Sequence, residues 1–187
     1  MAAKSRIVLL NGVGSAGKSS IAKALQTMTR SPFLHVAMDV FLEMLPEAYQ
    51  NHPESFRYEA RLEDGKPSIA IHHGPIGGRL MAGLRAAVAG LATEGNNLIV
   101  DDVIFGDDGS VADYRIRLAG HDLMLVGVHA PLAVLDAREK ARGDRQIGLA
   151  RWQFPRVHSG LTYDLEVDTA RNSPETCARR IRDRFDL

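Results

Sequence analysis

The chain has 187 residues, in which 23 Lys and Arg are balanced by 23 Asp and Glu, and it contains a single cysteine. This length predicts one domain, residues 1–187, with a well-buried core. The balanced charge argues against nucleic acid or an anionic membrane as partner, and one cysteine excludes an intramolecular disulfide framework. No apolar stretch approaches the roughly 20 residues that cross a bilayer. We expect a cytoplasmic protein with a small-molecule partner; the sequence leaves open whether it is a monomer or a homo-oligomer.

Short apolar runs alternate with amphipathic helical patterns along the chain, which is typical of βα units around a parallel sheet. The helical patterns begin near Lys18, at Val40, at Pro75, after Pro131 and at Pro174. Five runs are predicted to be the strands of this sheet: Arg6–Leu10, Phe33–Met38, Asn97–Val100, Leu123–His129 and Tyr163–Val167.

The least regular part of the chain is Asn51–Gly74, which is predicted to be an insertion between the second and third core strands. Insertions of this kind often shape a substrate pocket. Residues 40–80 are therefore predicted to hold the substrate.

The segment Gly12–Ser19 matches the spacing G-x-x-x-x-G-K-[ST] of a phosphate-binding loop. Its glycines let the backbone curl so that amide N–H groups point at phosphate oxygens, with the positive end of a helix dipole behind them. A chance match is the alternative, and the predicted strand and helix on either side count against it. The residues predicted to bind ATP here are Gly12, Gly14, Ser15, Ala16, Gly17, Lys18, Ser19 and Ser20.

Two acidic residues, Asp101 and Asp102, directly follow a buried strand, at the end where open α/β sheets bind their ligands. A carboxylate there can hold a Mg²⁺-bound water beside the Ser19 hydroxyl. The metal is therefore assigned to Ser19 and Asp101, the first residue past the apolar run. Asp102 remains an alternative, and both acids could instead cap the next turn.

Asp39 occupies the equivalent position at the end of the second predicted strand. A carboxylate near the terminal phosphate can accept the proton of an attacking hydroxyl, which is the task of the general base in kinases. The alternative is that Asp39 is no more than the N-cap of a helix Val40–Leu45. The residue pattern leaves both interpretations open.

Three arginines, Arg138, Arg142 and Arg145, follow the fourth predicted strand. In small phosphotransferases such a segment can close over the nucleotide, because guanidinium groups stabilise the charge on the transferred phosphoryl group. A solvated charged helix is the alternative. Gly143 and Gly148 flank Arg145 and would permit hinge motion, so residues 138–158 are predicted to form a mobile lid.

Taken together, these residues resemble the chloramphenicol phosphotransferases, which are ATP-dependent kinases with an adenylate-kinase-like fold. The resemblance extends over nearly the whole chain. Besides the phosphate loop, it rests on Asp39, on Gly74-Pro75 before a long helix, and on Ile99-Val-Asp-Asp-Val103. Its most selective parts are Ala141-Arg-Gly-Asp-Arg145 and Tyr163-Asp-Leu-Glu-Val-Asp-Thr169.

This resemblance implies a three-layer P-loop fold with a five-stranded parallel sheet, and phosphorylation of the primary hydroxyl of chloramphenicol. It implies that Asp39 is the base, that Arg138 lies near adenine, and that Arg142 and Arg145 approach the phosphates. The predicted catalytic residues are Asp39, Lys18, Arg142 and Arg145, with ATP and Mg²⁺ as cofactors. A kinase of another hydroxylated metabolite, such as a nucleoside, sugar or sugar acid, is the first alternative. A nucleotide-binding regulatory module is the second.

Overall fold

The computed structural model describes residues 4–106, 108–143 and 146–187, and is built around one parallel sheet. Its strands are β1 (Arg6–Asn11), β2 (Phe33–Ala37), β5 (Asn97–Asp102), β6 (Asp122–His129) and β7 (Leu165–Asp168). They lie in the order β2-β5-β1-β6-β7, and every neighbouring pair is parallel. The five strands predicted from the apolar runs are confirmed.

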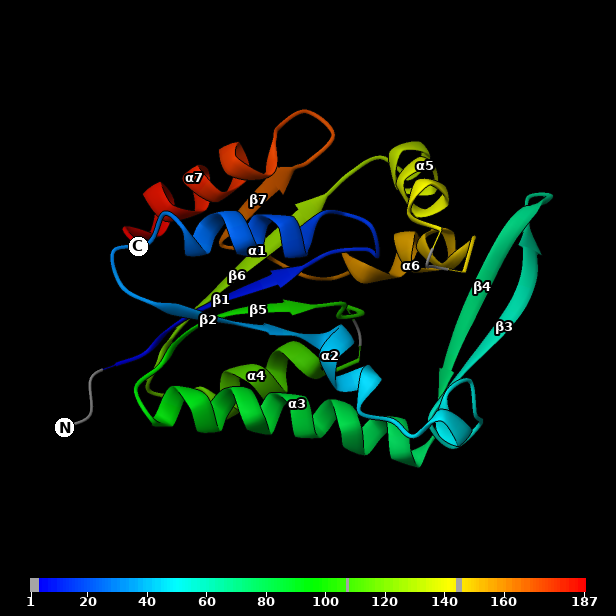
Figure 1. Cartoon of the computed structure of the whole chain (residues 1–187), viewed down its shortest axis with the longest axis horizontal. Helices are drawn as coiled ribbons and strands as arrows, with labels where there is room; N and C mark the ends of the chain where they lie inside the picture. The colour runs from blue at the N-terminus through cyan, green and yellow to red at the C-terminus, as the bar shows by residue number, and fades with distance from the viewer. Residues whose placement is uncertain (1–3, 107, 144–145) are drawn as a thin grey trace.

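Helices cover both faces of this sheet (Figure 1). On one face lie α1 (Lys18–Gln26) and α7 (Pro174–Phe185), and on the other lie α3 (Pro75–Thr93) and α4 (Ser110–Arg117). Each of the described helices is too short or too polar to cross a membrane.

Strand β1 shows why the fold has three layers. Val8 and Leu10 pack into the core under α1 and α7, whereas Ile7 and Leu9 pack into the core under α3. All four side chains are fully buried. A strand that is buried on both faces reads as a continuous apolar run rather than an alternating one, which is why this strand was evident in the sequence.

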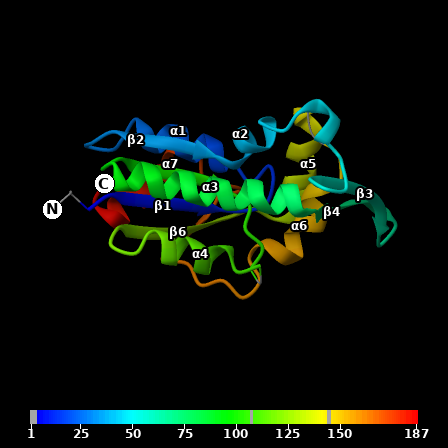
Figure 2. The ribbon, with the colours of Figure 1, turned by 90° about the horizontal axis from the view of Figure 1, so that it is seen from below.

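The segment Asn51–Gly74, for which no regular element was predicted, is mostly a β-hairpin, and it lies between β2 and β5 as expected of an insertion. Strand β3 (Phe56–Glu63) pairs antiparallel with β4 (Lys66–His73). The turn between them is Asp64-Gly65, with φ of 51° and 72°, the left-handed conformation that an Asp-Gly hairpin turn requires. The hairpin extends beyond the carboxyl ends of the sheet strands (Figures 1 and 2).

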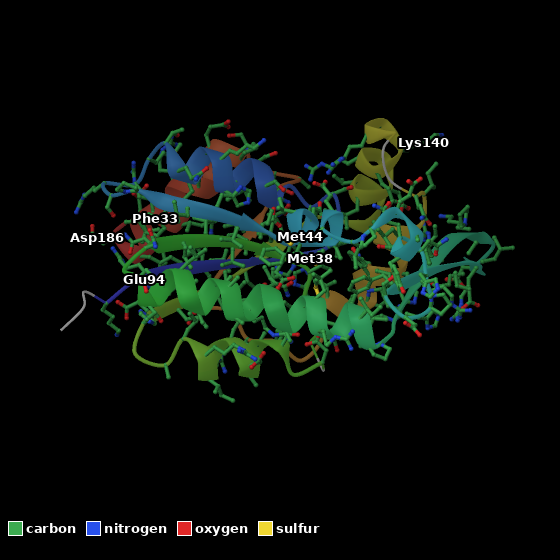
Figure 3. All side chains as sticks on the ribbon, turned by 60° about the horizontal axis from the view of Figure 1, so that its bottom comes forward. Phe33, Met38, Met44, Glu94, Lys140 and Asp186 are labelled. Carbon is green, nitrogen blue, oxygen red and sulfur yellow. The ribbon has the colours of Figure 1, made fainter. Side chains whose placement is uncertain are left out.

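Four further elements surround the same end of the sheet. They are α2 (Met38–Glu43), a single 3₁₀ turn η1 (Glu47–Tyr49), α5 (Leu132–Arg142) and α6 (Leu149–Val157). Figure 3 labels Met38 at the end of β2 that faces α2, and Phe33 at the opposite end of that strand. The carboxyl end of the sheet is therefore the end enclosed by additional structure.

Gly148 joins the hairpin to α6. Its carbonyl accepts a hydrogen bond from Ile69 N of β4 at 3.0 Å, and its N–H donates to buried Glu139 of α5 at 2.7 Å. Its φ is 103°, and a Cβ placed there would lie 2.7 Å from the carbonyl oxygen of Pro67. Only glycine fits this junction without strain.

We expect Gly148→Ala to lower the free energy of unfolding by about 2 kcal/mol, because it combines an unfavourable φ with a backbone clash. Gly83→Ala is the matched control, since Gly83 lies inside α3 with nothing within 4 Å of an added Cβ. That change should instead raise stability by about 0.5–1 kcal/mol. Denaturant titrations of both variants measure the two effects. Equal changes in the free energy of unfolding would contradict the conclusion that only glycine fits at position 148.

Candidate active site

The candidate site lies at the carboxyl ends of β1, β5 and β2. In the sheet register Leu10 pairs with Asp101 and Asn11 with Asp102, while Ala37 of β2 pairs with Asp101 from the other side. The glycine loop that follows Asn11 is therefore placed beside both acids. Ligands of open α/β sheets bind at this edge.

The loop between β1 and α1 has the shape of an anion-binding nest. Ser15 and Gly17 have φ of 64° and 95°, and α1 begins directly at Lys18. A Cβ on Gly12 would lie 2.5 Å from the carbonyl oxygen of Val128, so the backbone approaches β6 too closely for any side chain. The loop thus directs amide N–H groups and the positive end of a helix dipole toward the same space.

Two side chains of the loop support a phosphate ligand. Lys18 is 7% exposed, and its Nζ donates to the carbonyl oxygens of Gly12 at 2.9 Å and Val13 at 3.2 Å. The buried Ser15 Oγ has no hydrogen-bond partner within the described residues. A buried polar atom without a partner is costly, and a phosphate oxygen would satisfy it.

Asp101 lies against the loop. Its Oδ2 accepts a hydrogen bond from Ser19 Oγ at 2.5 Å, and its Oδ1 lies 3.8 Å from Lys18 Nζ. Burial by itself raises the pKa of this carboxyl, but its polar neighbours, with His35 the largest contributor, hold the pKa below its usual range. Asp101 is therefore ionised at neutral pH.

Ser19 and Asp101 together present the oxygen ligands that Mg²⁺ prefers. Within the described part of the chain, no group of three or more His, Cys, Asp or Glu side chains could hold a metal ion. A metal at this position would therefore complete its coordination with water and phosphate oxygens, as Mg²⁺ usually does in such sites.

Asp102 is engaged elsewhere. Its Oδ2 accepts from the Tyr114 hydroxyl at 2.9 Å and its Oδ1 from Val103 N at 2.8 Å. Burial is the main cause that raises the pKa of Asp102. Of the two acids, Asp101 is thus the one whose position beside Ser19 and whose charge suit a cation.

Asp39 lies in the first turn of α2, which begins at Met38 and has Ala37 as its N-cap residue. The alternative that Asp39 is the N-cap of a helix Val40–Leu45 is therefore wrong. Asp39 borders the pocket formed by the phosphate loop, together with Lys18 and Asp101. It also borders a second pocket, enclosed by α2, the hairpin, α3 and α6.

The walls of this second pocket are mostly apolar, and Met38, Leu42, Phe56, Ile71 and Met81 contribute to them. Arg85 and Asp102 also border it. The hairpin that forms part of this wall belongs to the segment 40–80 that was predicted to hold a substrate. We name this second pocket the acceptor pocket.

Two of the predicted arginines, Arg138 and Arg142, lie beside the loop. Arg138 donates to Thr169 through Nη1 to Oγ1 at 2.9 Å and through Nη2 to the carbonyl oxygen at 2.7 Å. Arg138 and Arg142 line an open pocket beside the loop, together with Ser15, Gly17 and Ser20. Arg142 also borders the phosphate pocket. Arg145 lies outside the described residues.

Sequence reasoning missed a buried hydrogen-bond network below the loop. Asn11 is fully buried; its Nδ2 donates to the Tyr163 hydroxyl at 2.9 Å, and its Oδ1 accepts from Ile104 N at 2.8 Å. The same hydroxyl lies 2.8 Å from His158 Nδ1. The ring of His158 stacks on His129 at 3.9 Å. The only local signal was a polar residue at the end of an apolar strand.

Burial, followed by the neighbouring His129, lowers the pKa of His158 to about 4. The unfolded chain takes up a proton near pH 6.5 whereas the folded protein does not, so stability should be full above that pH. Stability should fall as the pH decreases toward 4.

We expect His158→Gln to show a flatter dependence of unfolding free energy on pH. The exposed His73→Gln variant should follow the wild-type curve; if His158→Gln followed it too, the assignment would fail.

A phosphate loop at the carboxyl edge of a parallel sheet, with an ionised aspartate beside the loop serine, defines a P-loop protein, the class that contains small-molecule kinases as well as ATPases and GTPases. Comparison with known proteins is consistent with this class. The chain matches, over residues 5–186, the family described as chloramphenicol phosphotransferase-like protein, and it belongs to that family.

One relative is a Mycobacterium tuberculosis protein that carries the inferred name O-phosphotransferase. It is 31% identical over 185 residues, which cover 96% of this chain and 82% of the relative. The protein is thus a small-molecule phosphotransferase with a P-loop.

Solved structures show the same fold in kinases. The M. tuberculosis APS kinase CysC, in complex with AMPPNP and APS, aligns with a TM-score of 0.66 at 15% identity, covering 98% of this chain and 99% of that one. A gluconokinase from Sinorhizobium meliloti aligns with a TM-score of 0.61 at 18% identity, covering 100% and 98%. At these identities the likeness concerns the fold alone.

Proposed function

We propose that the protein transfers the γ-phosphoryl group of ATP to a hydroxyl of a small molecule held in the acceptor pocket, with chloramphenicol as the first candidate. The observation that carries this proposal is the position of Asp39, which borders both the phosphate pocket and the acceptor pocket. A carboxylate that faces both sites is suitably placed to meet an acceptor hydroxyl next to a terminal phosphate.

The nucleotide is proposed to bind with its phosphates on residues 12–20. Lys18 and the loop amides would neutralise the β- and γ-phosphates. Ser19 and Asp101 would hold Mg²⁺, which would offset the negative charge that develops during transfer. The open pocket beside the loop, bordered by Arg138 and Thr169, is the proposed place of the adenosine part.

In the proposed reaction the acceptor hydroxyl gives its proton to Asp39 while its oxygen attacks the γ-phosphorus. The bond between the γ-phosphorus and the bridging oxygen breaks, and ADP leaves. Arg142 is proposed to stabilise the negative charge on the transferred group, as is Arg145. Positioning and electrostatics supply nearly all of the rate acceleration in such a reaction.

The nature of the acceptor pocket supports chloramphenicol over a sugar. Its walls include Met38, Phe56 and Ile71, whereas a sugar presents hydroxyl groups on most of its surface and would leave them facing apolar side chains. An acceptor with an aromatic or apolar body and few polar groups fits such a pocket better. Membership in the chloramphenicol phosphotransferase-like family points the same way.

Lys18→Ala should reduce the rate of phosphoryl transfer by at least about 100-fold, because a preorganised cation at the transferring phosphates is lost. The exposed Lys23 of the same helix provides the control, and Lys23→Ala should keep the wild-type rate. The rate is followed as ADP release in the presence of acceptor. Near-normal turnover by Lys18→Ala would contradict the role of the loop.

Asp39→Asn should bind the non-hydrolysable analogue AMPPNP with Mg²⁺ as tightly as wild type, yet lose transfer by about 10²–10⁴-fold, the usual contribution of a general base. Calorimetry measures the first quantity and product formation the second. Glu47→Gln, a change of the same kind at the exposed turn η1, should affect neither. An unchanged transfer rate would remove Asp39 from this role.

The identity of the acceptor is tested by incubating the protein with Mg²⁺, ATP and a panel containing chloramphenicol, nucleosides, sugars and sugar acids. We expect chloramphenicol to gain one phosphate group, detected by mass spectrometry. Phosphorylation of another member alone would replace chloramphenicol as the substrate. Nucleotide binding without transfer to any acceptor would instead favour a regulatory module.

A further inference from the structure

Gln153 of α6 contacts the phosphate loop from outside the phosphate pocket. It is 4% exposed, and its Oε1 accepts a hydrogen bond from the backbone N–H of Gly14 at 2.7 Å, across 139 positions of the chain. A Cβ on Gly14 would lie 3.1 Å from this oxygen, so the two groups meet closely. This hydrogen bond joins a side chain of α6 directly to the backbone of the loop.

The helix that carries Gln153 is fixed at both ends. At its beginning, Glu139 accepts hydrogen bonds from Gly148 N and Ala150 N at 2.7 and 2.8 Å. At its end, the carbonyl oxygen of Val157 accepts from Asn11 Nδ2 at 3.2 Å, and that of Arg156 accepts from Gly106 N at 3.2 Å. Since the helix cannot shift easily, the position of the Gln153 carboxamide is well determined.

Gln153 also forms part of the wall of the acceptor pocket, together with Met38 and Asp39. It is not among the residues that border the phosphate pocket. The carboxamide therefore holds the loop from the side of the acceptor pocket, and a nucleotide could occupy the loop without displacing it. In this way one side chain connects the two sites between which a phosphoryl group would pass.

We propose that Gln153 is a positioning residue for phosphoryl transfer: it fixes the peptide of Gly14 so that the loop keeps its phosphate-binding shape against the acceptor pocket. This inference rests on the proposed function. It requires an uncharged hydrogen-bond acceptor at position 153. A group without an acceptor leaves the Gly14 N–H unsatisfied, and a carboxylate keeps the hydrogen bond but adds negative charge behind the triphosphate site.

The test measures the binding of Mg²⁺ and AMPPNP by calorimetry, which needs no knowledge of the acceptor. Gln153→Leu should weaken binding about 10-fold relative to wild type, because loss of this bond lets the loop leave its binding conformation. The control is Gln26→Leu, the same change at a residue of α1 whose Nε2 donates to Phe33 O at 2.8 Å, remote from the site. That control should bind as wild type does.

A second variant separates positioning from a purely structural role. Gln153→Glu should bind AMPPNP weakly at pH 8, where the introduced carboxyl group is ionised. As the pH falls and this group takes up a proton, it again resembles the amide, so affinity relative to wild type at the same pH should recover. Thermal unfolding of both variants at each pH monitors the fold, and recovery of affinity without a parallel rise in unfolding temperature separates positioning from a purely structural effect.

The possible outcomes are distinct. If wild type binds AMPPNP while Gln153→Leu binds equally tightly, or if Gln153→Glu shows no recovery at low pH, the positioning role of Gln153 is overturned and the proposed function stands. If wild type itself fails to bind AMPPNP, the proposed function fails, and the positioning role that rests on it fails with it. Weakened binding in Gln153→Leu, unchanged binding in Gln26→Leu and recovery of Gln153→Glu together would establish the role.

Discussion

The pairing of β1 between β5 and β6 is the constraint on which the rest of this structure depends. It brings Gly12 so close to the carbonyl oxygen of Val128 that only glycine fits, and it places Asp101 opposite Leu10, one strand away from the loop. The curled loop and its aspartate are thus products of a single register. A shift of this register by one residue would turn every side chain of β1 to the opposite face and separate Asp101 from Ser19.

Helix α6 has a comparable role on the other side of the loop. Through Gln153, Val157 and Gly148 it contacts the loop, the end of β1 and the hairpin in turn. Residues 138–158 were predicted to be a mobile lid, but α6 within this range has several buried contacts with the core. The two glycines predicted to permit hinge motion, Gly143 and Gly148, both have positive φ, but Gly148 is held by hydrogen bonds with Glu139 and Ile69. That motion stays a prediction.

Much of the fold could be predicted from the sequence because its signals are local. The core strands are apolar runs buried on both faces, and Ser173-Pro174 shows the helix start that the structure confirms, with Ser173 Oγ accepting from Thr176 N. The hairpin was missed because the burial of β3 follows no regular alternation. Its one clear local signal is the Asp64-Gly65 dipeptide, which favours a two-residue hairpin turn.

In the candidate site, too, the residues with local sequence signals could be predicted and those defined by long-range contacts could not. The loop and the acids at strand ends follow from motif and position. Asn11, Gln153 and Tyr163 could not be assigned, because the Asn11–Tyr163 and Gly14–Gln153 hydrogen bonds join residues more than 100 positions apart and nothing near each residue indicates the contact. Asp102 shows a further limit: the sequence could not separate it from Asp101, whereas the structure does, because Asp101 accepts from Ser19 and Asp102 from the Tyr114 hydroxyl.

The most direct test of the account is a crystal structure of the protein with Mg²⁺, AMPPNP and chloramphenicol. The account requires the γ-phosphorus to lie between Lys18 and Asp39, the metal to contact Ser19 Oγ, and the acceptor hydroxyl to lie within hydrogen-bond distance of the Asp39 carboxylate. Triphosphate density away from the loop, or an acceptor outside the pocket bordered by Asp39 and Gln153, would contradict it.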